Sequence, residues 1–133
     1  MKTNVCLSRK RLGEWAEVCF MQKVLSLGLS SAKPFGDSDR FDQAVFSGPK
    51  VSRVQVRSTR QFRDNRYELC VQHTRGHYTL ADADFIAAYV IPLDVWYIIP
   101  IAAITSHTKI HLAPHRPSRG RAELFREAWH LLM

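Results

Sequence analysis

Residues 37–59 have the sequence DSDRFDQAVFSGPKVSRVQVRST and contain the clearest structural signal in the chain. Two short runs of strand-forming residues, Phe41–Phe46 and Val51–Ser58, are separated by the turn sequence Ser47-Gly48-Pro49-Lys50. Strand-like runs on either side of a Gly-Pro turn predict a β-hairpin. Apolar and polar residues alternate in the second run, which predicts a strand with one buried face and one polar face.

The polar face of the second strand carries an unusual set of side chains. Val54 and Val56 are expected to point to one side, and Gln55 and Arg57 to the other. Asp42 lies near the start of the first strand, so the hairpin brings a carboxylate close to an amide and a guanidinium. Such a group indicates either a functional site or a polar network at the edge of a sheet.

This Asp…Gln-x-Arg pattern resembles the PD-(D/E)XK nuclease superfamily, in the branch of group I intron-encoded endonucleases and archaeal Holliday-junction resolvases. The resemblance extends over nearly the whole chain, through Gly13–Glu17, Lys33–Ser38, Val54–Thr59, Asp84–Tyr89, Trp96–Pro100 and Arg126–Leu132. It implies an α/β fold with a restriction-endonuclease-like core, in which a mixed central β-sheet is flanked by an N-terminal and a C-terminal helix. The length of the chain is that of one domain, residues 1–133.

The resemblance also implies an activity, that of an endodeoxyribonuclease which hydrolyses phosphodiester bonds with Mg²⁺, or with Mn²⁺ in its place. In such proteins an Asp on one strand and an acidic residue or Gln on the next bind the metal, which assigns this role to Asp42 and Gln55. Glu17 matches a helix glutamate that joins the metal site in related resolvases. The superfamily lysine that orients or activates the attacking water is replaced here by Arg57.

Arginine at position 57 leaves two functions open. Arginine keeps its charge at any working pH, so it cannot act as a general base, although it can bind a phosphate and stabilise transition-state charge. The first function is a metal-dependent endonuclease with a variant catalytic site of Glu17, Asp42, Gln55 and Arg57. The alternative is a catalytically weak or inactive DNA-binding protein with a nuclease fold.

Other carboxylates compete for the metal. Asp37 and Asp39 lie in the polar loop before the hairpin. In this family the ligand is carried by the strand itself, which favours Asp42. Glu17, with Glu14 three residues before it, can also be interpreted as a solvated pair near the start of a helix.

The composition suits a polyanionic partner. Lysine and arginine number 19 against 12 aspartates and glutamates, and the formal net charge is +7. Arginine binds phosphate through two parallel hydrogen bonds, and many of the arginines lie near the motif or in loops. The residues expected to contact DNA are Arg53, Arg60, Arg63, Arg116, Arg119 and Arg121. Relatives in the superfamily commonly assemble to cut both strands, so a homodimer or homotetramer is expected.

The three cysteines show no Cys-x-x-Cys spacing, which is typical of a reduced, cytoplasmic protein. The most apolar run, Val95–Ile104, is interrupted by Pro100 and is too short to span a bilayer. The sequence therefore predicts a soluble protein with no membrane partner and no small-molecule cofactor.

The ends of the chain are expected to be helical. Ser8 is suited to cap a helix that continues to Leu27, and apolar residues on most of its sides predict that it is well buried. A closing helix is expected over Ala122–Leu132.

Overall fold

The computed structural model describes residues 7–36, 38–73, 76–116 and 120–133. Its elements are α1 (Arg9–Ser26), β1 (Ser30–Ala32), β2 (Gln43–Ser47), β3 (Lys50–Thr59), β4 (Phe62–Arg63), β5 (Arg66–Cys70), β6 (Gln72–His73), β7 (Gly76–His77), β8 (Phe85–Val90), β9 (Val95–Pro100) and β10 (Lys109–Leu112). Four short 3-10 segments complete the fold: η1 (Ile91–Leu93), η2 (Ile101–Ala103), η3 (Arg121–Phe125) and η4 (Trp129–Leu132).

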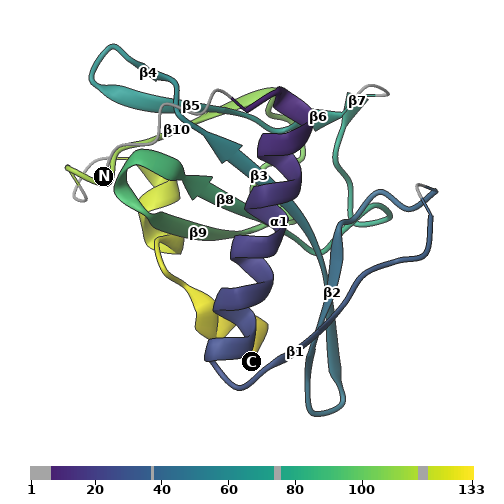
Figure 1. Cartoon of the computed structure of the whole chain (residues 1–133). Helices are drawn as coiled ribbons and strands as arrows, with labels where there is room; N and C mark the ends of the chain where they lie inside the picture. Colours follow the sequence, from purple (N-terminus) through teal and green to yellow (C-terminus); the bar gives the residue numbers. More distant parts are fainter. Residues whose placement is uncertain (1–6, 37, 74–75, 117–119) are drawn as a thin grey trace.

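The central sheet has five strands in the order β1-β2-β3-β8-β9 (Figure 1). The predicted hairpin is present: β2 and β3 pair antiparallel, and Gly48 in their turn has a φ of 56°, which glycine adopts without steric cost. Strand β3 also pairs in parallel with β8, and β8 pairs antiparallel with β9. Because both kinds of pairing occur, the sheet is mixed, as expected.

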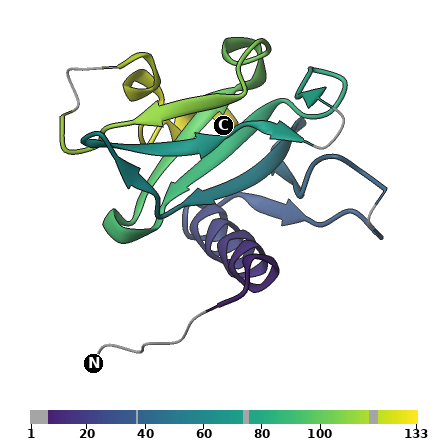
Figure 2. The same ribbon diagram turned by 90° about the horizontal axis from the view of Figure 1, so that it is seen from above.

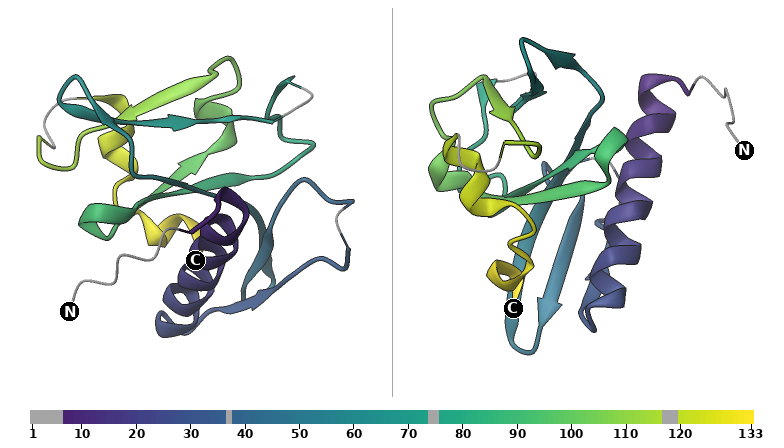
Figure 3. Two further views of the ribbon diagram at one scale, coloured as in Figure 1. Left: turned by 45° about the horizontal axis from the view of Figure 1, so that its top comes forward. Right: turned by 90° about the vertical axis from the view of Figure 1, so that its left-hand side faces the viewer.

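The sheet is covered on both faces. Helix α1 lies across one face, and a second sheet of order β10-β5-β4 lies on the other (Figures 2 and 3). The two resulting apolar clusters share β8, whose residues 86–90 are all buried. A strand with both faces in the core needs apolar side chains at successive positions, which explains the continuous Phe85–Val90 run.

Helix α1 begins and ends as its sequence predicts. The Ser8 hydroxyl accepts a hydrogen bond from the Arg11 backbone N–H, 3.2 Å away, and satisfies one of the unpaired donors of the first turn. Leu27 is the C-cap, and Gly28 follows with a φ of 81°. Within the described ranges, no helix has the length and apolarity needed to cross a membrane.

The prediction that α1 is buried on most sides is wrong. Only one face of the helix contacts the sheet, through Ala16, Phe20 and Val24. On another side, Val18 and Leu25 are 60% and 56% exposed. The apolar residues outside the packed face therefore form an exposed row rather than a second core contact.

The closing α-helix predicted over Ala122–Leu132 is also wrong, because η3 and η4 replace it. Arg126 between them is extended and forms an isolated bridge to β9, and Glu127 has a φ of 52°. The Glu127 carboxylate accepts hydrogen bonds from the Trp96 backbone N–H at 3.1 Å and from Trp129 Nε1 at 2.7 Å. Tertiary hydrogen bonds thus outweigh the local helical preference of the segment.

Candidate active site

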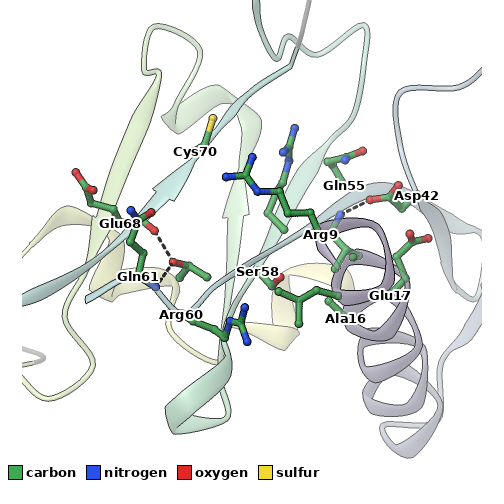
Figure 4. A pocket seen from close by; sticks show the side chains of 15 residues that line it. Arg9, Ala16, Glu17, Asp42, Gln55, Ser58, Arg60, Gln61, Glu68 and Cys70 are labelled. Carbon is green, nitrogen blue, oxygen red and sulfur yellow. Dashed lines mark hydrogen bonds between the residues drawn. The ribbon is translucent and has the colours of Figure 1, made fainter. Parts of the chain in front are cut away.

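A groove of about 800 Å³ lies between the first turns of α1 and the second half of β3, and it continues to β5 (Figure 4). Strand β2 pairs with β3 only as far as Gln43 opposite Val54. Beyond this point, no strand among the described residues pairs with the edge of β3 that β2 covers elsewhere. The open edge explains why polar side chains gather there. The lining residues are Arg9, Leu12, Gly13, Ala16, Glu17, Asp42, Gln55, Val56, Arg57, Ser58, Thr59, Arg60, Gln61, Glu68 and Cys70.

Asp42 immediately precedes β2 and is bound to the open edge of β3. Its backbone N–H donates to the Val54 carbonyl at 2.9 Å, and its carboxylate accepts a hydrogen bond of 2.8 Å from the Val56 N–H. Burial raises the pKa of the Asp42 carboxyl to about 6, although the Val56 hydrogen bond acts in the opposite direction. The negative charge of Glu17 raises this pKa further. The ionised carboxylate is therefore poorly solvated and would be stabilised by a cation.

Arg57 lies two residues beyond Gln55 on β3, and both line the groove, as the strand alternation predicts. The Arg57 guanidinium is held in place by Tyr78 and Gln72. Its Nη2 donates to the Tyr78 hydroxyl at 2.5 Å and to the Gln72 carbonyl at 3.3 Å, and it lies 5.5 Å from the centre of the Tyr78 ring. Arg57 Nε is buried and has no hydrogen-bond partner among the described residues. The guanidinium is thus fixed in place through Nη2, and its buried Nε–H is not used by any described residue.

Glu17 projects from α1 toward the end of the groove that also holds Asp42 and Gln55 (Figure 4). Its carboxylate forms an ion pair with Lys33, with 2.9 Å between Oε1 and Nζ. This hydrogen bond raises the pKa of the Lys33 ammonium, and the negative charges of Asp42 and Glu14 add to the effect. Lys33 therefore remains charged and partly neutralises the acidic end of the groove.

Gln43 holds the backbone of Glu17 from the face of the sheet that α1 covers, and it was not predicted from the sequence. It is fully buried, with Nε2 donating to the Glu17 carbonyl at 2.9 Å and Oε1 accepting from the Ser31 hydroxyl at 2.5 Å. These two bonds connect α1, β1 and β2. A signal was present, because Gln43 occupies a core-facing position of β2 on the same side as the apolar Val45.

The structure thus brings Glu17, Asp42, Gln55 and Arg57 into one groove. Asp39 is exposed and lines a different cavity with Arg40, whereas Asp37 lies outside the described residues. No three His, Cys, Asp or Glu side chains within the described part of the chain are grouped closely enough to hold a metal ion. A cation at the end of the groove near Gln55 would therefore have two carboxylates available, those of Glu17 and Asp42, and would depend on the Gln55 amide oxygen as a further ligand.

The arginines expected to contact DNA lie in several environments. Arg60 lines the groove, Arg63 is exposed on β4, and Arg121 is exposed at the start of η3. Arg116 donates to the Asn65 carbonyl at 3.3 Å. Arg119 lies outside the described residues.

Arg53 has intramolecular partners instead of a free guanidinium. It forms an ion pair with Asp84 and donates to the carbonyls of Leu80 and Ala81 at 2.6 and 3.0 Å. These contacts connect β3 to the segment before β8. Arg9, which was not singled out from the sequence, lines the groove beside the active-site residues.

The mixed sheet, the helix across one face and the carboxylates at an open strand edge define an α/β protein of the restriction-endonuclease-like class. The model of the PD-(D/E)XK endonuclease family matches residues 7–132, and the chain belongs to this family. It is also similar to a solved bacterial homing endonuclease, I-Ssp6803I, with a TM-score of 0.82 and 31% sequence identity; the match covers 95% of this chain and 91% of that chain. A search of curated proteins gave no match.

These comparisons confirm the family resemblance and the fold class predicted from the hairpin motif. They support an endonuclease, and nucleases of this family act on DNA and generally use divalent metals.

Proposed function

We propose that the protein is a DNA endonuclease that hydrolyses phosphodiester bonds with a divalent cation, Mg²⁺ or Mn²⁺, held by Asp42, Gln55 and Glu17. The observation that carries this proposal is the convergence of two carboxylates and an amide at one end of the groove, where burial and the neighbouring charge raise the pKa of Asp42. Oxygen donors are the ligands that Mg²⁺ prefers, and a cation would relieve the repulsion between the two carboxylates.

The residues of the groove suit the demands of phosphodiester hydrolysis. A bound divalent cation would supply Lewis-acid stabilisation and lower the pKa of the attacking water. Gln55 contributes a neutral oxygen in place of the usual carboxylate, so Glu17 would restore the missing negative charge. Arg57, fixed by Tyr78 and Gln72, would donate to an oxygen of the scissile phosphate and stabilise the charge that develops there.

The second candidate function is a DNA-binding protein with weak or no catalysis. Arg57 favours it, because the superfamily lysine is absent and arginine cannot exchange a proton with water at neutral pH. The charge and the groove serve DNA binding equally well under either function.

A cleavage assay separates the two functions. We expect purified protein to nick or cut at least one of plasmid, branched or single-stranded DNA in Mg²⁺ or Mn²⁺, and to leave all of them intact in EDTA. Retention of DNA in a gel without cleavage in either metal would instead support the binding protein. If the protein neither cleaves nor retains DNA, both candidate functions are contradicted.

A change at Lys33 tests whether Glu17 is part of the metal site. Replacing Lys33 by methionine removes the cation that pairs with the Glu17 carboxylate. An exposed ion pair is worth roughly 0.2–1 kcal/mol, so the metal concentration for half-maximal binding should fall by about 1.5- to 5-fold. Isothermal titration of metal-free protein with Mn²⁺ measures this directly.

Lys109→Met is the matched control, since it removes one exposed positive charge from β10, on the other sheet. It should leave the metal affinity unchanged. Equal metal affinities in the wild type and the Lys33 variant would argue that Glu17 does not contact the cation.

Cutting both strands of a duplex in one binding event takes one active site for each strand, so we further propose that the protein acts as a homodimer or homotetramer. Sedimentation equilibrium of the protein with and without duplex DNA would determine the number of chains. A monomer on DNA that makes only single-strand nicks would overturn this part of the proposal.

A further inference from the structure

Strands β4 and β5 form a hairpin that projects from the second sheet (Figure 1), and residues of β5 line the groove. Strands β4 and β5 are joined by Asp64 and Asn65, which have φ values of 53° and 64°. Two consecutive left-handed residues are typical of the tight turn that closes a twisted two-stranded ribbon. All residues from 60 to 66 are exposed.

A short ribbon of this kind is marginally stable by itself, but here it is braced from the side. His115 Nε2 lies 3.3 Å from Asn65 Oδ1, and Arg116 donates to the Asn65 carbonyl. The Phe62 ring packs against Tyr67 and His115, with ring centres 4.9 and 5.6 Å apart. The hairpin is therefore held in a fixed position although it is exposed.

Two arginines, Arg63 and Arg66, lie on either side of the turn at the tip of the hairpin. Arg63 and Arg66 are directly opposite each other in the ladder, and like charges in such positions destabilise a strand pair. Among the described residues, neither forms an ion pair with a carboxylate. A ligand that presents negative charge or hydrogen-bond acceptors would turn this repulsion into a favourable contact.

The hairpin is continuous with the candidate active site. The groove extends from Asp42 and Glu17 through Ser58 and Arg60 to Glu68 of β5 (Figure 4). A nucleic acid whose scissile phosphate lies at the acidic end would pass along this groove toward the base of the hairpin.

We propose that the β4–β5 hairpin enters the major groove of duplex DNA and that Arg63 and Arg66 read base edges there, so that this hairpin determines sequence preference. This inference rests on the proposed function. The major groove admits a two-stranded ribbon, and arginine recognises guanine through two hydrogen bonds to O6 and N7. Phe62, which is 53% exposed at the base of the ribbon, offers an apolar surface for a thymine methyl group.

The test is selection of bound sequences from a random-sequence duplex library, in EDTA, for the wild type and three variants. In Arg63→Lys/Arg66→Lys, the charge remains but the paired hydrogen bonds are lost. This variant should bind the library with nearly wild-type affinity and lose about 10- to 100-fold of base discrimination at a few adjacent positions. Arg63→Ala/Arg66→Ala should lose the same discrimination and also bind all sequences less tightly.

The charge-matched control is Lys10→Ala/Arg11→Ala on α1, which removes two exposed positive charges away from the hairpin. It should keep the selected sequence unchanged, and thermal unfolding of each variant reports whether it is folded. If the selected sequence is the same in the wild type and both hairpin variants, the hairpin contacts phosphates only and the inference is overturned. Wild-type protein that binds DNA without selecting any sequence would overturn it equally. Failure to bind or cut any DNA would instead overturn the proposed function.

Discussion

Replacing Asp42 by asparagine is expected to abolish metal-dependent cleavage and, at the same time, to make the metal-free protein more stable. Under the proposed function Asp42 is the anionic ligand of the cation, so its loss removes several kcal/mol of charge stabilisation and the cleavage rate should fall by roughly 10³-fold or more. The gain in stability arises because the partly buried carboxylate is costly when ionised, as its pKa of about 6 indicates. Asparagine can still accept the hydrogen bond from the Val56 N–H.

The stability difference should depend on pH in a defined direction. The carboxyl pKa is about 6 in the folded chain and 3.8 in the reference state, so the folded protein binds the proton more tightly. Wild-type stability therefore decreases as the pH rises from about 4 to 6, and the full cost is present above this range. The asparagine variant should be more stable by roughly 1–3 kcal/mol at pH 7–8, about 3–10 °C in melting temperature, and by little near pH 4.

Thermal unfolding in EDTA across this pH range, beside a cleavage assay at pH 8, measures both effects. Asp39→Asn is the matched control, because Asp39 is an exposed aspartate only three residues away that lines a different cavity. It should change neither stability nor cleavage appreciably. An Asp42 variant that still cleaves DNA, or that is less stable than the wild type at pH 8, would contradict the proposed role of Asp42 as a metal ligand with a raised pKa.

The second large effect is expected at Arg57. Replacing it by alanine removes a fixed donor that, under the proposed function, stabilises transition-state charge, so kcat should fall by about 10²- to 10³-fold. DNA affinity should change much less, since one phosphate contact is lost among several. Arg57→Lys should also cleave more slowly than the wild type, because an ammonium cannot reproduce the fixed planar guanidinium.

Single-turnover cleavage and a separate binding measurement distinguish these effects. Tyr78→Phe removes the hydroxyl that positions Arg57 and should produce a smaller loss of rate, with the pH profile unchanged. Arg60→Ala removes an arginine from the same groove and should mainly weaken binding. A rise in cleavage on Arg57→Lys would show that the chemistry requires an ammonium and that the natural arginine impairs it.

That Glu17, Asp42, Gln55 and Arg57 meet in one groove could largely be predicted from local patterns in the sequence. Strand alternation places Gln55 and Arg57 on one face, and the hairpin turn sets the register that brings Asp42 to the same edge. The helix carrying Glu17 follows from its cap and apolar spacing. Each of these signals is contained in a short segment, so no knowledge of distant contacts is needed.

The errors and omissions arise from contacts between distant segments. The anchoring of Arg57 by Tyr78 joins residues 21 positions apart, and neither sequence environment indicates it. The segment Ala122–Leu132 has helical spacing, but hydrogen bonds of Glu127 with Trp96 and Trp129 interrupt it. Strand β4 could not be predicted from the sequence, because its two residues are too few to show alternation.

Only Arg60 and Gln61 separate the end of β3 from the start of β4. The Thr59 hydroxyl donates to the Glu68 carbonyl at 2.6 Å and accepts from the Gln61 N–H at 3.1 Å, so this connection has little freedom to move. Under the proposed roles, the catalytic residues on β3 and the base-reading hairpin β4–β5 are therefore held at a fixed distance from each other. The bond that is broken would lie a constant number of base pairs from those that are recognised. Changes in the hairpin would then select a different target, while the position of the cut within that target stayed the same.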